Sequence, residues 1–352
     1  MAMLLNRSSR LRHSSLSRLI HTGFAASSSP SLLSAIDRDQ KADLPAFCSS
    51  SSASSSHTKE LGFAAISAAV GAVAFFSAWH VGTSSSPAEM EADKIALNPN
   101  EWKHFKLQQS EKISHNTKLH RFELDPDSKL GLNVASCILT RAQMGTDKDG
   151  KPKFVIRPYT PISNKNAKGY FDLLIKEYPE GKLSKHIANL KPGDTLEVKG
   201  PIPKLTYTPN MKKNIGMIAG GTGVTPMLQI IEEILNNPED NTQIAFLYGN
   251  LSPEEILLKE RIDALAESHP NLKVFYIVDK PTDGWRGGSG YITKDLIVKG
   301  MPAPADDILI LVCGPPGMMK HISGDKAPDR SQGELSGLLK EAGYKADQVY
   351  KF

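Results

Sequence analysis

The stretch from Gly220 to Pro226, GGTGVTP, follows the apolar run 215–219 and has the residue types of a phosphate-binding turn. Its glycines, Gly220, Gly221 and Gly223, allow a sharp bend and bring bare backbone N–H groups close to an anion, at the positive end of the helix that follows. We expect Thr225 to cap that helix. Pro226 fits the first helical turn, where no N–H donor is required.

The glycine turn lacks the rest of a Rossmann dinucleotide fingerprint. The next apolar run ends in Tyr248-Gly249-Asn250, so no carboxylate stands there to hold a ribose. Taken alone, this stretch is also consistent with a glycine turn that has a purely structural role and binds no phosphate.

A second stretch, Arg157-Pro158-Tyr159-Thr160, ends a β-like run. An arginine supplies a fixed fork of donors for a pyrophosphate, and a tyrosine two positions on lies on the same strand face and gives a flat stacking surface. With the threonine hydroxyl, these are the groups that a flavin dinucleotide needs. A turn stiffened by proline, with a surface arginine, remains the alternative.

Two shorter stretches could complete such a site. Gly181-Lys182-Leu183-Ser184 opens a short helix, and it suits either a second phosphate contact or a plain helix start. Cys313-Gly314-Pro315 follows an apolar strand, and in an open α/β sheet ligands bind beyond the carboxyl ends of the strands. Cys313 could line a nicotinamide pocket without acting as a nucleophile, or it could be an inert buried cysteine.

The elements that carry these stretches divide the chain into two halves. Residues 98–205 alternate short β-like runs with Gly and Pro turns, which predicts a small antiparallel barrel. Residues 215–352 alternate strands with helices, including one helix over 252–268, which predicts a parallel sheet with covering helices. Residues 206–214 form the linker. The fold class is therefore a two-domain α+β and α/β protein.

The N-terminus has a different composition. The first 36 residues contain four arginines and no acid, so they account for the whole net charge of +4 and give the folded part no basic excess for nucleic acid. Residues 1–57 resemble a mitochondrial or plastid transit peptide with a Ser-rich linker, although a disordered tail has a similar composition. Residues 61–80 predict a transmembrane anchor, with a peripheral or matrix-sorted helix as the alternative.

The chain has only three cysteines, Cys48, Cys137 and Cys313, and they lie far apart. An iron–sulfur cluster held by four thiolates is therefore excluded, and we expect no metal site.

Together, RPYTPIS, GKLS, GGTGVTPM and CGPPGMM resemble the ferredoxin-reductase superfamily and, within it, the NADH-cytochrome b5 reductases, in that family's order over residues 101–352. With the leader and anchor, the resemblance is to the mitochondrial, plant-like branch. It implies an antiparallel FAD-binding barrel followed by an NAD-binding α/β domain. It also implies a membrane-anchored monomer that passes electrons from NADH through FAD to cytochrome b5 or a similar small haem protein.

The resemblance also assigns site residues. Those implied to approach the FAD are Arg157, Pro158, Tyr159, Thr160, Leu174, Lys176, Tyr178, Lys182, Leu183, Ser184 and Thr225. Those implied to lie along the NADH are Gly220, Gly221, Thr222, Cys313, Gly314 and Pro315, with Asp279 near the adenosine ribose, where a carboxylate would repel the 2′-phosphate of NADPH. Thr160 and Cys313 are the expected catalytic residues, at the flavin N5 and the nicotinamide.

The sequence departs from the family pattern at Ala135-Ser136-Cys137, where a Gly-Gln-His-type segment is usual, so this edge of the flavin pocket is not predicted. Lysines near the flavin motifs could form a basic face for an acidic cytochrome. The sequence is also consistent with two other hypotheses for the function. One is a related NAD(P)H-flavin reductase with a quinone, ferric or ferredoxin acceptor, and the other is a non-catalytic, membrane-tethered nucleotide-binding scaffold.

Overall fold

The computed structural model describes residues 93–352, which form two sheets of six strands and one short strand pair. The predicted leader (1–57) and anchor (61–80) lie outside the described residues. Within residues 93–352, none of the helices combines the length and the apolar character that a membrane span requires.

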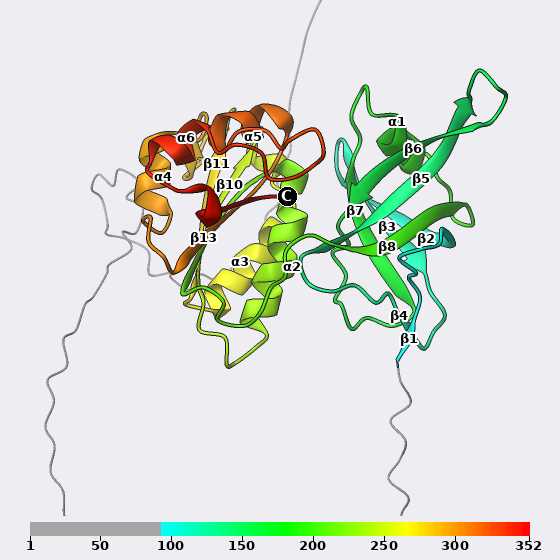
Figure 1. Ribbon diagram of the computed structural model, residues 1–352, viewed down its shortest axis with the longest axis horizontal. Coiled ribbons are helices and arrows are strands. Elements are labelled where there is room, and N and C mark those ends of the chain that lie inside the picture. Colours follow the sequence, from blue (N-terminus) through cyan, green and yellow to red (C-terminus); the bar gives the residue numbers. More distant parts are fainter. Residues whose placement is uncertain (1–92) are drawn as a thin grey trace, which may run out of the picture. The chain divides into compact units, whose positions relative to one another are not determined.

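The first half is an antiparallel sheet with strand order β6-β5-β8-β2-β3-β7 (Figure 1). Three residues past β6, the Ile162 N–H donates to the Asp172 carbonyl on β7 at 3.0 Å, so the segment after one end strand bonds to the other end strand. The elements of this half are β1 (Lys94–Ile95), β2 (Lys103–Ser114), β3 (Thr117–Glu123), β4 (Ser128–Lys129), β5 (Ser136–Thr146), β6 (Pro152–Tyr159), β7 (Tyr170–Lys176), α1 (Lys182–Ala188) and β8 (Thr195–Pro203).

Aromatic side chains fill the centre of this half. Phe171 on β7 stacks on Phe122 of β3 and meets Phe105 of β2 edge-on, with ring centroids 5.2 and 5.3 Å apart. The helix α1 adds Leu183 and Ile187 to the same cluster. Such burial of large apolar side chains is the main stabilising contribution to a small sheet of this kind.

The strand β7 is buried on both faces. Because side chains alternate along a strand, Phe171, Leu173 and Ile175 point into the core of the first half. Leu174 points the other way and packs with residues of the second half. This strand therefore joins the two halves through apolar contact, and Lys176 lies on the same strand face as Leu174.

The second half is a parallel sheet with strand order β12-β11-β10-β9-β13-β14. Its strands are β9 (Asn214–Gly220), β10 (Gln243–Asn250), β11 (Leu272–Val278), β12 (Gly288–Ser289), β13 (Ile308–Cys313) and β14 (Val349–Lys351). Its helices are η1 (Gly221–Gly223), α2 (Val224–Leu235), η2 (Pro253–Glu255), α3 (Lys259–Ser268), α4 (Lys294–Gly300), α5 (Pro316–Ile322), α6 (Gly337–Glu341) and η3 (Ala346–Gln348).

Helices cover both faces of the parallel sheet (Figure 1). One apolar cluster joins α2 and α3 to one face, and a second joins α4, α5 and α6 to the other. On β9, Met217 belongs to the first cluster and Ile218 to the second, as alternation along a strand requires. The central strands are apolar on both faces, which is typical of a parallel sheet.

The prediction of one continuous helix over 252–268 is wrong, because the chain breaks in the middle of this range. The chain forms η2, then breaks at Leu258, which has the left-handed value φ 58°, and only then forms α3. A leucine pays a steric penalty in that region, so the break is imposed by packing and not by local preference.

Candidate cofactor site at the ends of the parallel strands

The glycine turn lies directly beyond β9, as its sequence predicts. Gly221 has φ 53°, in the left-handed region that favours glycine, and no atom lies within 4 Å of the position a Cβ would take. The backbone at Gly221 therefore faces open space and can approach a ligand closely.

Our expectation that Thr225 caps α2 is wrong. The 3₁₀ turn at Gly221–Gly223 makes Gly223 the cap residue, with no side-chain cap. Thr225 is the second residue of the helix, and its hydroxyl donates to the Thr222 carbonyl at 3.2 Å. Pro226 does lie in the first helical turn.

A buried tyrosine holds the turn from below. Tyr248 on β10 is completely buried, and its hydroxyl donates to the Gly221 carbonyl at 2.9 Å. Burial also raises the pKa of this hydroxyl well above its usual range, so it remains a donor at neutral pH. The hydrogen bond fixes the peptide whose glycine takes the unusual φ value.

The end of β13 packs against the glycine turn without intervening side chains. A Cβ on Gly223 would lie 2.1 Å from the Cys313 carbonyl oxygen, and one on Gly220 would lie 2.4 Å from the Met318 sulfur. Real Cβ atoms do not approach a backbone atom so closely, so Gly223 is required by the contact between the two turns, whereas the atom nearest Gly220 is the end of a flexible side chain.

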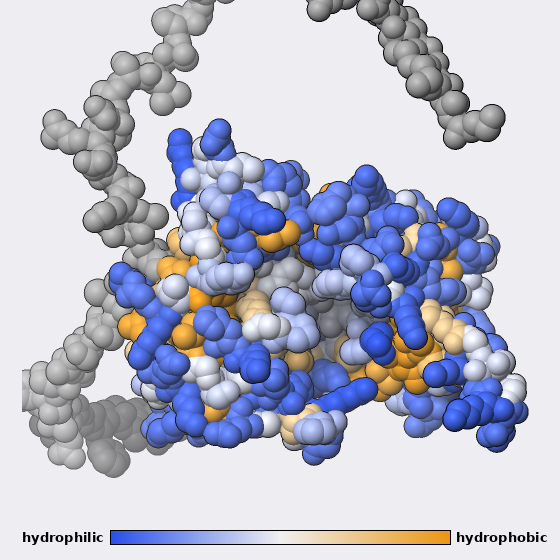
Figure 2. All heavy atoms as spheres, turned by 90° about the horizontal axis from the view of Figure 1, so that it is seen from above, coloured by the Kyte–Doolittle hydropathy of each residue, from blue (hydrophilic) through white to orange (hydrophobic). Residues whose placement is uncertain are grey.

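The first cavity, of about 600 Å³, lies over the glycine turn. Predicted residues that line it are Lys176, Tyr178, Gly220, Gly221, Asp279 and Pro315. Asp279 follows β11 directly, and partial burial raises the pKa of its carboxyl above the ordinary value. The exposed Tyr178 and Tyr291 border this cavity. Elsewhere, hydrophilic residues cover much of the surface that Figure 2 shows, and apolar residues gather in smaller areas.

The second cavity, of about 440 Å³, adjoins the first and shares Lys176, Tyr178 and Pro315 with it. Its other predicted lining residues are Pro158, Tyr159, Thr160, Leu174, Thr222, Thr225, Cys313 and Gly314. Burial raises the pKa of the Cys313 thiol to about 12, so the side chain is a neutral thiol and not a thiolate nucleophile at neutral pH. Burial likewise raises the pKa of Tyr159 to about 12.

Four residues assigned by the resemblance line neither cavity. Arg157 is exposed, and its Nη1 donates to the adjacent Ile156 carbonyl. Lys182 is exposed at the start of α1, while Leu183 points into the core of the first half, so only its backbone can face a ligand. Ser184 is buried, and its hydroxyl bonds locally to the Gly181 carbonyl and the Tyr178 N–H. Their contacts with a cofactor stay predictions.

Several lining residues were not predicted. Cys137, in the segment that departs from the family pattern, lines the second cavity with Lys204 and Phe352. Asn250 and His321 line the first cavity. The position of Asn250, at the carboxyl end of a parallel strand, could have identified it from the sequence as a lining residue. No sequence pattern identifies Lys204 and Phe352, because the fold brings them to the cavity from distant parts of the chain.

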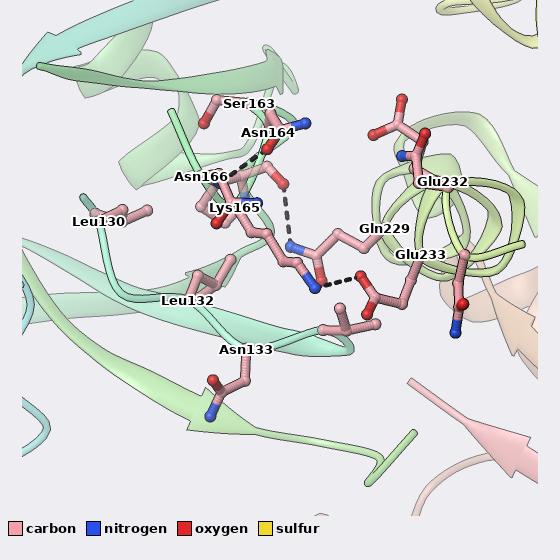
Figure 3. Close-up of a pocket in the computed structure, with 14 residues that line it drawn as sticks. Leu130, Leu132, Asn133, Ser163, Asn164, Lys165, Asn166, Gln229, Glu232 and Glu233 are labelled. Atoms are coloured by element: carbon pink, nitrogen blue, oxygen red, sulfur yellow. Dashed lines mark hydrogen bonds and ion pairs between the residues drawn. The ribbon is translucent and has the colours of Figure 1, made fainter. Parts of the chain in front are cut away.

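A third cavity, of about 390 Å³, lies between the first half and the side of α2 (Figure 3). Gln229 on α2 donates to the Pro161 carbonyl at 3.1 Å, and Lys165 pairs with Glu233 at 2.6 Å. Arg261 on α3 donates to the Ile162 carbonyl at 3.1 Å. The segment that follows Thr160 is therefore held by polar contacts to the helices of the second half.

The residues fit a flavin and a nicotinamide dinucleotide. The glycine turn offers backbone donors beside open space, and both cavities fall within the size range of small-molecule sites. The cavities also lie side by side, since they share three residues.

Comparison with known proteins agrees with this geometry. Residues 104–207 match the oxidoreductase FAD-binding domain, and residues 217–324 match the oxidoreductase NAD-binding domain. The chain is therefore an oxidoreductase with one domain for each cofactor.

Named relatives narrow this class. An NADH-cytochrome b5 reductase-like protein of Arabidopsis thaliana is 64% identical over 264 residues, covering 75% of this chain and 80% of the relative. NADH-cytochrome b5 reductase 2 of Aspergillus clavatus is 49% identical over 254 residues, covering 71% and 77%. The chain belongs to the NADH-cytochrome b5 reductase family.

Solved structures show the same fold. The cytochrome b5 reductase domain of Ulva prolifera nitrate reductase matches with a TM-score of 0.63 and 36% identity, covering 73% of this chain and 98% of that one. A ferredoxin NADP+ reductase from Neisseria gonorrhoeae, with 18% identity and a TM-score of 0.54 over 71% of this chain and 98% of that one, shares the fold.

Replacing Gly223 with alanine should destabilise the protein, because the new Cβ would lie 2.1 Å from the Cys313 carbonyl oxygen. We expect a loss of roughly 1–3 kcal/mol in the free energy of unfolding, as for other overpacked sites. Gly317→Ala is the matched control, since no atom lies within 4 Å of its Cβ position. Chemical denaturation measures both, and equal stabilities would contradict the close contact.

Tyr248→Phe should weaken NADH binding while keeping the packing of the ring. The partly buried Gly221 carbonyl would lose this donor, and a typical hydrogen bond contributes a net stabilisation of about 0.5–1.5 kcal/mol. We expect the KM for NADH to rise by about three- to tenfold with little change in kcat. Tyr276→Phe removes a hydroxyl that bonds Asp263 instead and serves as the control. A KM equal to wild type would show that the turn does not depend on this bond.

Proposed function

We propose that this protein is an NADH-cytochrome b5 reductase, which takes a hydride from NADH and delivers electrons singly to cytochrome b5 or a similar small haem protein. The observation that carries the proposal is the pair of adjoining cavities. One is lined by the glycine turn of the NAD-binding domain, and the other by the Pro158-Tyr159-Thr160 stretch of the FAD-binding domain. Residues 98–205 and 215–352 are the proposed domains, joined by 206–214.

Bound FAD supplies the redox chemistry, because a flavin accepts two electrons together and releases them one at a time. The chain contributes binding and orientation. Backbone N–H groups of the glycine turn and the Lys176 ammonium are suited to pyrophosphate. Tyr159 and Thr160 offer a ring face and a hydroxyl to the second cavity. The neutral Cys313 thiol lines the second cavity beside these two residues.

The acceptor would dock on an exposed lysine surface of the first half. Of the lysines beside the flavin stretches, Lys165 and Lys168 pair with Glu233 and Asp93. Lys151, Lys153, Lys182 and Lys185 are exposed and remain the better candidates. Complementary charge of this kind speeds the encounter with an acidic partner.

We further propose a mitochondrial, membrane-anchored monomer, in which residues 1–57 target the chain and residues 61–80 cross a membrane. The support is composition: an acid-free, arginine-containing start and a charge-free apolar run of nearly 20 residues. Expression of the full chain with a C-terminal fluorescent tag, followed by carbonate extraction of the organelle membranes, tests the location and the anchor.

Asp279→Ala should narrow the preference for NADH over NADPH. Asp279 lines the first cavity beyond β11, where its charge would repel a 2′-phosphate. We expect the ratio of the two kcat/KM values to fall by about tenfold, which corresponds to about 1.4 kcal/mol. Asp283→Ala removes the same charge from an exposed position nearby and should leave the ratio unchanged. A constant ratio in Asp279→Ala would remove this carboxylate from the specificity argument.

The acceptor is tested with the purified protein, NADH and a set of oxidised acceptors. We expect NADH to bleach the flavin absorbance and oxidised cytochrome b5 then to be reduced faster than a quinone, a ferric chelate or ferredoxin. A colourless protein would instead favour the nucleotide-binding scaffold. Preferential reduction of another acceptor would favour a different reductase of the same family fold.

A further inference from the structure

Lys176 stands at the boundary between the two cavities and lines both. It is the last residue of β7, and it lies on the same strand face as Leu174, which packs against the second half. Its ammonium does not extend freely into either cavity. Instead, Nζ lies 2.5 Å from Oε2 of Glu255, and the two side chains are only 20% and 8% exposed.

Glu255 belongs to the second half, at the end of η2. It lines neither cavity, so it would not contact a ligand there directly, whereas Lys176 would. Its other oxygen, Oε1, lies 3.8 Å from Nε2 of His115, which is on the first half. His115 is therefore a second potential cationic partner for the carboxylate when its ring is protonated.

A pyrophosphate in either cavity would compete with Glu255 for the ammonium. Lysine carries three N–H donors on a flexible stem, so the head group can turn between a carboxylate and a phosphate. The negative charge of Glu255 would oppose phosphate binding at the same position, because the ion pair already neutralises the lysine. Loss of that charge should leave Lys176 more attractive to an anion.

We propose that Glu255 is a positioning residue that holds the Lys176 ammonium at the cavity edge in the nucleotide-free protein and yields it to the pyrophosphate of the nicotinamide dinucleotide. The inference rests on the proposed function, because it requires that dinucleotide to bind in the first cavity. Its consequence is a limit on affinity: the ion pair weakens the binding of both NADH and the oxidised product, which favours product release.

The test is equilibrium binding of ADP-ribose, measured by calorimetry on the FAD-loaded, full-length protein. ADP-ribose retains the pyrophosphate but undergoes no redox reaction, so binding is read without turnover. Glu255→Gln should lower its Kd by about three- to tenfold, the range expected for removing one nearby charge in a partly screened site. Binding of adenosine, which lacks the phosphates, should not change.

Three further variants separate positioning from general structural effects. In a Lys176→Met background, Glu255→Gln should change the Kd by less than about twofold, because residues that act as a unit are not additive. Glu233→Gln breaks the Lys165 ion pair at the third cavity, another contact between the halves, and should leave the Kd unchanged. If Glu255→Gln folds poorly, Glu255→Asp replaces it. This variant keeps the charge on a shorter side chain, so it should lower the Kd for ADP-ribose by a smaller factor.

The outcomes are distinct. An unchanged or higher Kd in Glu255→Gln overturns the proposal, and so does an equal decrease in the Lys176→Met background. A wild-type protein that binds FAD but neither ADP-ribose nor NADH contradicts the proposed function itself.

Discussion

The site depends on a backbone contact between the glycine turn and the end of β13. These two segments end neighbouring parallel strands, with Cys313 in register with Ala219. Because Gly223 has no side chain, its Cα can lie against the Cys313 carbonyl, and the two turns form one continuous wall. Both cavities use that wall: Gly221 and Pro315 line the first, and Thr222 and Cys313 line the second.

A second constraint is the double burial of β7. A strand with one face in solvent would make no contact with the second half. On β7, however, Leu174 packs into the apolar cluster around α2. The same strand face then continues to Lys176 and Tyr178, which line both cavities. Leu174, which joins the halves, and Lys176, which borders both cavities, are thus neighbours on one strand, so a shift between the halves would reshape the site.

Local sequence predicted much of this arrangement. The glycine turn follows β9, the Cys313 stretch follows β13, and the alternation of strands and helices from residue 215 predicts the parallel sheet. These features depend on the period of apolar residues and on where strands end, which are properties of short segments. The order of motifs along the chain then added the family resemblance, and with it fourteen of the 31 residues that line the two cavities.

What could not be predicted comes from contacts between distant segments. The hydrogen bond from Tyr248 to Gly221 joins residues 27 positions apart, and the sequence around Tyr248 indicated only that a ribose-binding acid was missing. The capping role given to Thr225 was wrong because the 3₁₀ turn places the cap at Gly223 and the helix begins at Val224. Glu255 lies in a charged stretch where no pattern distinguishes it from Glu254. Only the fold shows that Glu255 is buried against Lys176. A residue that acts on a ligand through another residue leaves no motif of its own, so such roles must be argued from the packed structure.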